Sequence, residues 1–197
     1  MAVLSGKKVL LGVTAGIAAY KTAYIVRLFI KAGAEVRVVM TPESKEFVTP
    51  LTLSTLSKNE VYSSFTNVEG ESWNNHVELG LWADFMLIAP ATANTLSKMA
   101  NGHSDNLLLA TYLSAKCPVY FAPAMDLDMY KHPSTKVSLN KLGDFQNKMI
   151  PVGSGELASG LQGEGRMAEP EEILAFIENN LKSQLPLYGK KMLITAG

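Results

Sequence analysis

The sequence contains little cysteine and little histidine. Its 197 residues include one cysteine, Cys117, and three histidines. A single thiol excludes an internal disulfide and is typical of a reducing cytoplasm, and no spacing of Cys and His resembles a metal site. We therefore expect a cytoplasmic protein without a bound metal. Cys117 precedes a predicted buried strand, and we interpret it as a core residue.

Charge is also scarce. Asp, Glu, Lys and Arg make up 18% of the chain, and the formal net charge is zero at pH 7. No basic cluster is long enough to follow a phosphate backbone, so nucleic acid is not an expected partner. Apolar residues make up 47% of the sequence. This balance favours a surface buried between subunits, although a large α/β core would explain part of it.

Long apolar runs are missing as well. No segment has the roughly 20 apolar residues that a membrane-spanning helix needs. The apolar run after the polar residues 5–8 stops at Thr14, which does not fit a signal peptide. We expect neither a membrane span nor a secretory leader.

The chain does show an alternation of strand-like and helix-like segments. Apolar runs rich in Val, Leu and Ile predict buried strands at residues 8–14, 35–40, 84–89, 118–122 and 149–152. Helical spacing, with Gly33 as a C-cap and Pro170 in a first turn, predicts helices at residues 17–32, 49–56, 93–100, 106–114, 134–142 and 170–181. Residues 61–75 and 153–165 are expected to be loops. The order predicts an α/β fold with a doubly wound parallel sheet.

The last residues repeat the pattern of the first predicted strand. Residues 189–197, GKKMLITAG, contain a basic pair, an apolar run and a glycine turn. We expect residues 1–185 to form one domain and residues 186–197 to begin a second, nucleotide-binding domain of a longer protein. An extra edge strand of the first domain is the alternative.

The first strand is followed by a turn of small residues, Thr-Ala-Gly-Ile-Ala-Ala-Tyr (14–20). Free N–H groups at the start of the next helix, around Gly16, would make an anion site. The three-glycine dinucleotide pattern and the Walker lysine are both missing, so a mononucleotide or a lone phosphate fits better than NAD. Any tight turn of small residues would look similar.

Two further strand ends carry small or hydroxyl residues. The second strand leads to Thr41, with Ser44 and Phe47 beyond it, and the third ends in Ala-Pro-Ala-Thr-Ala-Asn (89–94). At the carboxyl edge of a parallel sheet these residues would reach the same ligand, and small side chains would let a flat ring approach the backbone. The alternative is that Thr41 and Thr92 simply cap the helical turns that follow them.

Three other features are candidates for chemistry. A histidine such as His76 would suit proton transfer or carboxylate binding, although an isolated histidine is more often an ordinary surface residue. Residues 123–130, with two acids and two methionines, form either a binding segment or a plain turn. The glycine-rich residues 153–165 form either a lid over the site or a connector.

Five of these motifs together resemble the homo-oligomeric flavin-containing cysteine decarboxylases. They are Gly-Val-Thr-Ala-Gly-Ile-Ala-Ala-Tyr-Lys (12–21), His-Val-Glu-Leu-Gly (76–80), Ala-Pro-Ala-Thr-Ala-Asn (89–94), Pro-Ala-Met (123–125) and Gly-Glu-Gly-Arg-Met (163–167). The resemblance implies a flavodoxin-like three-layer α/β/α domain that binds FMN between the subunits of a homotrimer or homododecamer. It also implies decarboxylation of 4'-phosphopantothenoylcysteine to 4'-phosphopantetheine in coenzyme A biosynthesis, with a possible ligase activity in a C-terminal part.

The resemblance also implies roles for individual residues. Catalysis is assigned to His76 and, at the position of a family cysteine, to Ser159. The other implied residues are Ala15, Gly16, Ile17, Thr41, Ser44, Phe47, Ala91, Thr92, Ala93 and Asn94 for the cofactor, and Met125, Asp126, Met129 and Ala158 for the substrate.

Two positions depart from the family pattern. Asp126 stands where the family usually has Asn, and an ionised carboxylate cannot donate a hydrogen bond to a substrate anion as an amide does. Ser159 replaces a cysteine that donates a proton, and a hydroxyl is a far weaker acid than a thiol. Ser159 is therefore a lineage variant with another proton donor, an engineered change, or the mark of an enzyme that releases the enethiol.

Two other functions compete with this interpretation. A flavin prenyltransferase of the prenyl-FMN synthase type shares the fold, but its Gly-Ala-Ser-Gly first turn is not found here. A non-catalytic FMN-binding regulatory subunit would be compatible with loss of the lid cysteine. Release of carbon dioxide from the substrate distinguishes an enzyme from such a subunit.

Overall fold

The computed structural model describes residues 3–67, 72–157 and 159–190, and these contain a six-stranded parallel sheet in the order β3-β2-β1-β4-β5-β6. Successive strands are added on one side of β1, through β2 to β3, and then on its other side, from β4 through β5 to β6, which makes the β1–β4 pair a topological switch point. The strands are β1 (Lys8–Val13), β2 (Glu35–Met40), β3 (Val61–Tyr62), β4 (Phe85–Ala91), β5 (Val119–Pro123) and β6 (Lys148–Met149). A doubly wound parallel sheet is therefore confirmed.

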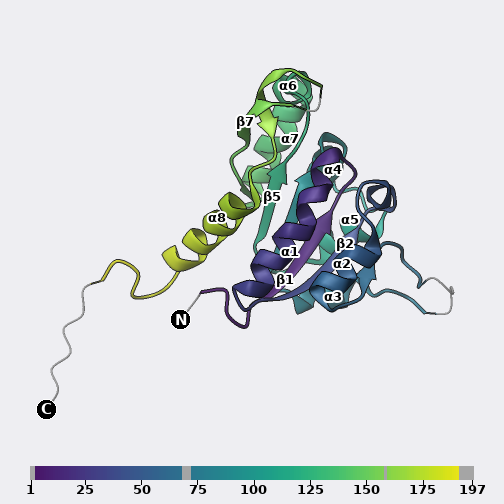
Figure 1. The fold of residues 1–197 in the computed structure, drawn as a ribbon, viewed down its shortest axis with the longest axis vertical. Helices are drawn as coiled ribbons and strands as arrows, with labels where there is room; N and C mark the ends of the chain where they lie inside the picture. The colour runs from purple at the N-terminus through teal and green to yellow at the C-terminus, as the bar shows by residue number, and fades with distance from the viewer. Residues whose placement is uncertain (1–2, 68–71, 158, 191–197) are drawn as a thin grey trace, which may run out of the picture.

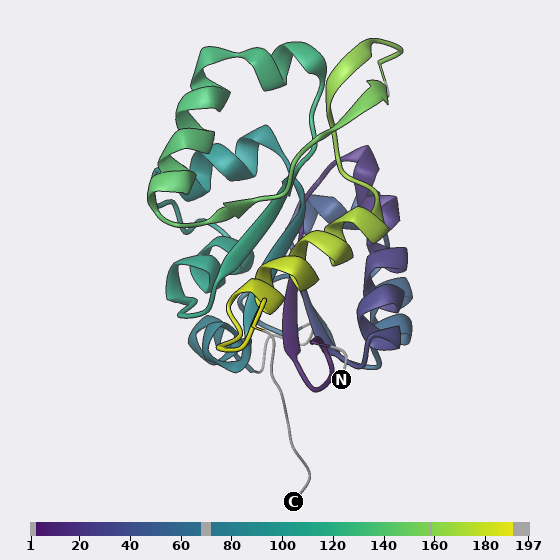
Figure 2. The same ribbon diagram turned by 90° about the vertical axis from the view of Figure 1, so that its left-hand side faces the viewer.

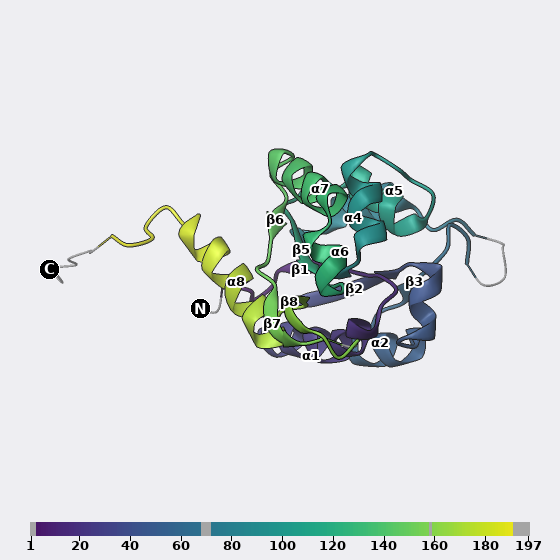
Figure 3. The ribbon, with the colours of Figure 1, turned by 90° about the horizontal axis from the view of Figure 1, so that it is seen from above.

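Helices cover both faces of the sheet, giving the three layers expected of a flavodoxin-like fold (Figures 1 and 3). One face packs against α1 (Thr22–Lys31), α2 (Pro50–Ser57) and α8 (Pro170–Ser183). The other packs against α3 (His76–Trp82), α4 (Ala93–Ala100), α5 (Leu107–Ser114) and α7 (Pro133–Asp144). Figure 2 shows α8 crossing in front of the sheet beside α1.

Burial on both faces explains why the strands could be recognised. All seven residues of β4 are buried, as are five of the six residues of β1. A strand that packs helices on both sides needs apolar side chains at every position instead of at alternate ones. Cys117 packs half-buried against the core cluster on the α3–α7 side, and burial raises the pKa of its thiol. The interpretation of Cys117 as a core residue is thus confirmed.

Most helix boundaries follow their predicted signals. Thr49 and Asn106 are N-caps whose side chains accept hydrogen bonds from Thr52 N and Leu109 N, and Gly33 takes the left-handed backbone that ends the first helix. Pro170 opens α8. The predicted helix 17–32, however, begins as a 3₁₀ segment, η1 (Ile17–Lys21), before α1.

Two expectations about loops were wrong, and one helix was not predicted. Residues 61–75 contain β3, which pairs in parallel with β2, and an isolated bridge between Thr66 and Trp73. Residues 153–165 belong largely to an antiparallel hairpin of β7 (Gly153–Glu156) and β8 (Gln162–Arg166). The segment from His76 forms α3, whose first backbone N–H groups are capped by Asn75.

Residues 191–197, which include most of the proposed second-domain segment, lie outside the described residues, so that domain stays a prediction. Among the helices that the structure describes, none combines the length and the apolar character that a membrane crossing requires.

Candidate functional site

A cavity of about 970 Å³ lies at the carboxyl ends of the parallel strands, next to the β1–β4 switch point. This is the expected place for a ligand in an open α/β sheet, and the volume suits a cofactor with a substrate. Its wall comes from the ends of β1, β2, β4 and β5, from α6 (Leu127–Lys131), and from the β7–β8 hairpin. Figure 1 shows the hairpin and α6 together beyond the ends of the strands.

The turn after β1 supplies one side of the cavity. Ala15, Gly16 and Ile17 line it, and Gly16 stands before η1 with an extended backbone and no side chain to cap the helix. The N–H groups that open a helix have no acceptor within it and attract anions. A Cβ added at Gly16 would meet only Thr92 Cγ2, at 3.4 Å, so the space beside it belongs to the cavity.

Thr41 supplies the clearest sign of a missing partner. It lines the cavity, it is 4% exposed, and its Oγ1 is buried without a hydrogen bond. A buried hydroxyl without a partner is costly and rare, so a ligand oxygen is the expected acceptor or donor. Thr41 also precedes the 3₁₀ segment η2 (Pro42–Glu46) without capping it through its side chain. The capping alternative for Thr41 was therefore wrong.

Two neighbours of Thr41 lie away from the cavity. Ser44 is completely buried, and its hydroxyl donates to the Thr41 carbonyl at 2.7 Å. Phe47 is exposed and, like Ser44, is not part of the cavity wall. Within the described protomer, the structure thus brings only Thr41 of this predicted group to the ligand space.

The end of β4 is tied to the end of β1. Thr14 Oγ1 donates to the Pro90 carbonyl at 2.6 Å and accepts from Thr92 N at 3.3 Å. Thr92, Ala93 and Asn94 line the cavity, whereas Ala91 is buried behind it. The Thr92 hydroxyl donates to Thr95 Oγ1 and makes no backbone cap, so the capping alternative was wrong here as well.

The segment after β5 and the hairpin face each other across the cavity. Met125, Asp126 and Met129 line one side, and Glu156, Leu157 and residues 165–167 line the other. Met125 N donates to the Gly165 carbonyl at 3.0 Å, which fixes β8 against the start of α6. This geometry supports the lid interpretation, although the lid is a hairpin. Ala158 lies outside the described residues, and Ser159 is exposed and not part of the wall.

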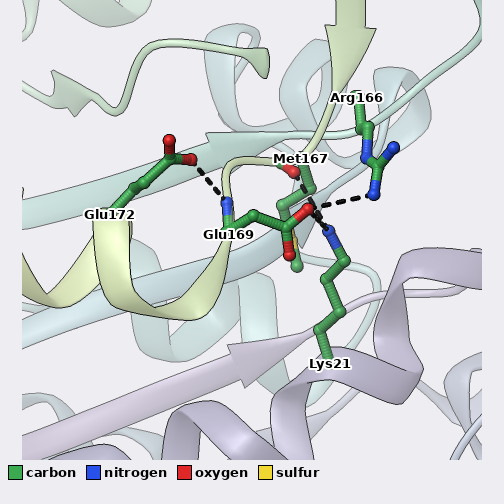
Figure 4. A network of polar contacts seen from close by, with 5 residues as sticks. All are labelled: Lys21, Arg166, Met167, Glu169 and Glu172. Carbon is green, nitrogen blue, oxygen red and sulfur yellow. Dashed lines mark hydrogen bonds and ion pairs between the residues drawn. The ribbon is translucent and has the colours of Figure 1, made fainter. Parts of the chain in front are cut away.

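An ion-pair network joins the hairpin to the first turn (Figure 4). Lys21 is buried on the cavity wall, and its Nζ contacts Glu169 Oε1 at 2.9 Å and the Met167 carbonyl at 3.4 Å. Arg166 Nη2 contacts the same Glu169 oxygen at 3.0 Å. The hydrogen bond from Lys21 holds the pKa of Glu169 below its ordinary value. Glu169 therefore links η1 to β8.

We expect Glu169→Gln to lower the free energy of unfolding at pH 7 by about 1–2 kcal/mol, because Lys21 would keep its buried charge without an anionic partner. This loss lies between the values typical of breaking an exposed ion pair and of breaking a buried one. The folded state lowers the pKa of Glu169, so its contribution is present above the ordinary glutamate pKa and is lost as pH falls through the lowered value. Urea unfolding at pH 7 and pH 3 measures this difference. The exposed Glu46→Gln is the control, and equal losses at both pH values would contradict the link.

His76 lies apart from the cavity in the protomer. Its ring meets Trp73 and Phe65 edge-on, with ring centroids 5.6 and 6.3 Å away, and its Nδ1 is buried without a partner. The wall of the cavity does not include it. One copy of the chain therefore does not bring His76 to the site that the strand ends form.

Some residues of the cavity wall were not predicted from the sequence. They include Lys21, Arg166 and the ion pair of Lys98 with Asp105, in which the hydrogen bond from Lys98 lowers the pKa of Asp105. Lys21 had a usable signal, since it follows Ile17 by four residues on a helix whose face is otherwise apolar. A charged residue at such a position needs a buried partner or a ligand.

Comparison with known proteins places the chain beside decarboxylases. Residues 2–182 match the family model described as Flavoprotein. A cysteine/cysteine sulfinic acid decarboxylase of an unknown prokaryotic organism is 56% identical over 154 residues, which cover 76% of this chain and 43% of that protein. The coenzyme A biosynthesis bifunctional protein CoaBC of Bacillus subtilis (strain 168) is 41% identical over 196 residues, which cover 98% of this chain and 48% of that protein. The chain thus spans about half the length of these curated relatives.

Solved structures agree with the fold. A mutant of a PPC decarboxylase, complexed with pantothenoylaminoethenethiol, superimposes with a TM-score of 0.79 at 36% identity, covering 89% of this chain and 98% of the other. The FMN-binding protein AtHal3 superimposes with a TM-score of 0.77 at 36% identity, covering 91% and 98%.

Proposed function

Because this chain belongs to the Flavoprotein family, we propose that it binds FMN and decarboxylates 4'-phosphopantothenoylcysteine to 4'-phosphopantetheine in coenzyme A biosynthesis. The observation that carries the proposal is the single cavity wall on which the first turn, Thr41, the end of β4 and the segment after β5 meet. Solved structures that superimpose on about nine-tenths of this chain include a PPC decarboxylase and an FMN-binding protein.

The residues present fit a flavin mononucleotide. Two groups suit the phosphate. The N–H groups around Gly16 have no side-chain cap and can donate to phosphate oxygens, and the Thr41 hydroxyl is buried without a protein partner. Ala93, with its small side chain, and Asn94 would border the ring. When bound, FMN supplies the electron sink that makes loss of carbon dioxide feasible. The protein positions the substrate carboxylate beside that ring and excludes water with the hairpin.

We propose that His76 completes the site of a second copy in a homo-oligomer, a trimer or a dodecamer. It lies outside its own cavity, and large apolar side chains are exposed beside it and on its helix, with Trp73 57% and Leu81 59% accessible. Ile17 and Tyr20 are likewise 63% and 59% exposed beside the cavity. Burying both surfaces between copies would remove apolar area from water and bring the imidazole to the ligand. Light scattering of the FMN-loaded protein tests the assembly.

Three further assignments are part of the same proposal. Residues 186–197 would begin a second domain, as expected from a relative described as bifunctional, and a ligase activity would belong to that part. The protein would act in the cytoplasm on a small-molecule substrate. Expression of a longer chain with its ligase assayed separately would test the domain assignment.

The test of the function has two steps. The purified protein is expected to be yellow, with flavin absorption, and to release carbon dioxide from 4'-phosphopantothenoylcysteine without oxygen. A colourless protein that takes up no FMN would refute the flavoprotein assignment. A yellow protein that releases no carbon dioxide would favour a non-catalytic FMN-binding role.

Gly16→Val tests the position of the phosphate. Its backbone is extended and a Cβ there meets only one atom at ordinary contact, so the fold tolerates a side chain. The valine methyl groups would occupy the ligand space, and we expect FMN affinity to fall at least about a hundredfold, or about 2.7 kcal/mol. Flavin titration of the apoprotein measures this, with Gly16→Ala as an intermediate control. Unchanged affinity would place the phosphate elsewhere.

A second candidate is decarboxylation of free cysteine or cysteine sulfinic acid. The relative described in those words is 56% identical to this chain over 154 residues. Asp126, an acid on the cavity wall, would suit the ammonium group that a free amino acid carries. Comparing kcat/KM for cysteine and for 4'-phosphopantothenoylcysteine decides between the two substrates.

A further inference from the structure

Asp126 is an uncommitted acid on the wall of the cavity. It follows β5 at the N-cap position of α6, yet its side chain makes no capping hydrogen bond. It is half-buried, and in the described part of the chain no ion pair or side-chain hydrogen bond occupies its carboxylate. A capping acid normally bonds the helix N–H groups. This carboxylate is therefore left for the cavity.

The proposed net conversion of 4'-phosphopantothenoylcysteine to 4'-phosphopantetheine consumes a proton at carbon. The carbon–carbon bond breaks, carbon dioxide leaves, and the electron pair that remains must end in a new carbon–hydrogen bond. One substrate carboxylate and one proton are therefore consumed for each molecule of carbon dioxide and of decarboxylated product that forms. Substrate and product differ only by carbon dioxide, so no outside oxidant or reductant enters the balance. A group that touches the substrate must deliver that proton.

The other charged groups around Asp126 are already engaged or exposed. On the cavity wall they are Lys21, Glu43, Lys98, Asp105, Glu156 and Arg166, and on the neighbouring elements they are Asp128, Lys131, Lys136 and Glu164. Lys21 pairs with Glu169, and Glu43, Asp128 and Lys131 are exposed. Arg166 pairs with Glu169, Lys98 pairs with Asp105, and Lys136 lies over the Tyr130 ring at 3.8 Å. Glu156 and Glu164 are exposed on the hairpin. Ser159 has no acidic proton to give at neutral pH.

Resting on the proposed decarboxylase function, we propose that Asp126 is the acid that supplies the proton taken up at carbon. A substrate carboxylate bound beside Asp126 gives two carboxyl groups that cannot both be ionised at close range, so they share one proton. That proton first holds the substrate by a hydrogen bond. After carbon dioxide has left, and once the electron pair is again available at the substrate carbon, Asp126 Oδ delivers the proton to that carbon, and solvent then reprotonates Asp126.

The seating of the hairpin favours transfer from Asp126 over transfer from bulk water. Gly163 and Gly165 place β8 directly over the start of α6, where side chains would collide with Leu127 and with the Met125 carbonyl. The hydrogen bond from Met125 N to Gly165 O holds this contact. The acid is therefore fixed on the sheet side of a closed lid, where a proton is delivered at short range.

The test compares Asp126→Asn, Asp126→Glu and the matched exposed control Asp128→Asn in the FMN-loaded protein. An amide still donates a hydrogen bond to the substrate carboxylate but carries no transferable proton. We expect Asp126→Asn to keep KM within about threefold and to lower kcat at least about a hundredfold. Wild-type and Asp126→Glu rates should fall as pH rises, while the residual rate of Asp126→Asn should keep only the pH dependence that the imidazole of His76, proposed above to come from a second copy, contributes.

Chemical rescue provides a readout that a structural role would not move. In Asp126→Ala, added formic acid should restore turnover, and more strongly at lower pH because the undissociated acid is the donor. Retained kcat in Asp126→Asn, or no rescue by formic acid, would overturn the assignment. The assignment would also be overturned if Asp126→Asn lost turnover of free cysteine but kept turnover of 4'-phosphopantothenoylcysteine, since Asp126 would then bind an ammonium group. A wild-type protein without FMN or without any carbon dioxide release would refute the function itself.

Discussion

Replacing His76 by Asn is expected to leave a yellow, assembled protein whose decarboxylation is at least about a thousandfold slower. Proton transfer by a positioned side chain accounts for roughly 10²–10⁴-fold in rate, and an amide cannot titrate. The helix that carries position 76 should persist, because its N–H groups are capped by Asn75. Anaerobic carbon dioxide release and the flavin spectrum, measured on the same sample, separate catalysis from cofactor binding.

The chain offers a matched control for this substitution. His103 is exposed, and His103→Asn should keep full turnover. Mixing His76→Asn with a cavity variant such as Gly16→Val adds a second test, because mixed oligomers would contain sites with an intact histidine from one copy and an intact cavity from another. Partial recovery of activity on mixing is expected if the site is shared. Full activity of His76→Asn alone would remove the imidazole from the mechanism.

The sequence was a good guide wherever burial determined the residue type. The apolar runs of β1, β2, β4 and β5 were recognisable because helices cover both faces of the sheet. The two residues of β3 carry no such signal, since both are only half-buried at the edge. The hairpin was hidden for another reason. A glycine-rich sequence predicts a loop, and only the contact of β8 with α6 in the structure shows that the glycines allow the two segments to pack closely.

The candidate site divides in the same way. Gly16 and the end of β4 were predictable because parallel strands must present their carboxyl ends at one edge. Whether Thr41 caps a turn or faces a ligand depends on tertiary packing, and sequence left both open. His76 could not be placed from the chain alone, and in the structure the wall of the cavity does not include it. Lys21 was missed because its partner Glu169 lies 148 residues further along the chain.

Gly165→Ala is expected to have the largest structural effect of any small substitution at the site. Gly165 has a φ of 128°, which other residues rarely adopt, and a Cβ there would lie 2.5 Å from the Met125 carbonyl oxygen. Backbone strain and overpacking each cost about 1–3 kcal/mol. We expect unfolding free energy to fall by about 3 kcal/mol, as measured by urea denaturation, with β8 displaced from α6.

Displacement of β8 should affect the substrate more than the cofactor. Met125 and Asp126 lie under the hairpin, whereas the turn at Gly16 and Thr41 belong to other segments of the wall. We expect KM to rise at least about tenfold while FMN affinity changes less than about threefold. Steady-state kinetics and flavin titration measure the two quantities separately.

A graded glycine series makes the argument quantitative. At Gly163 a Cβ would meet the flexible end of Leu127 at 2.7 Å, so alanine there should cost less than at Gly165, where the obstacle is backbone. At Gly143, within α7, nothing lies within 4 Å, and alanine should stabilise the helix by up to about 1 kcal/mol. If Gly165→Ala matched Gly143→Ala in stability and in KM, close seating of the hairpin on α6 would have no part in substrate binding. A loss of unfolding free energy that increases from Gly143 through Gly163 to Gly165 would instead show that the hairpin can lie this close to Asp126 and the start of α6 only because these positions of β8 have no side chain.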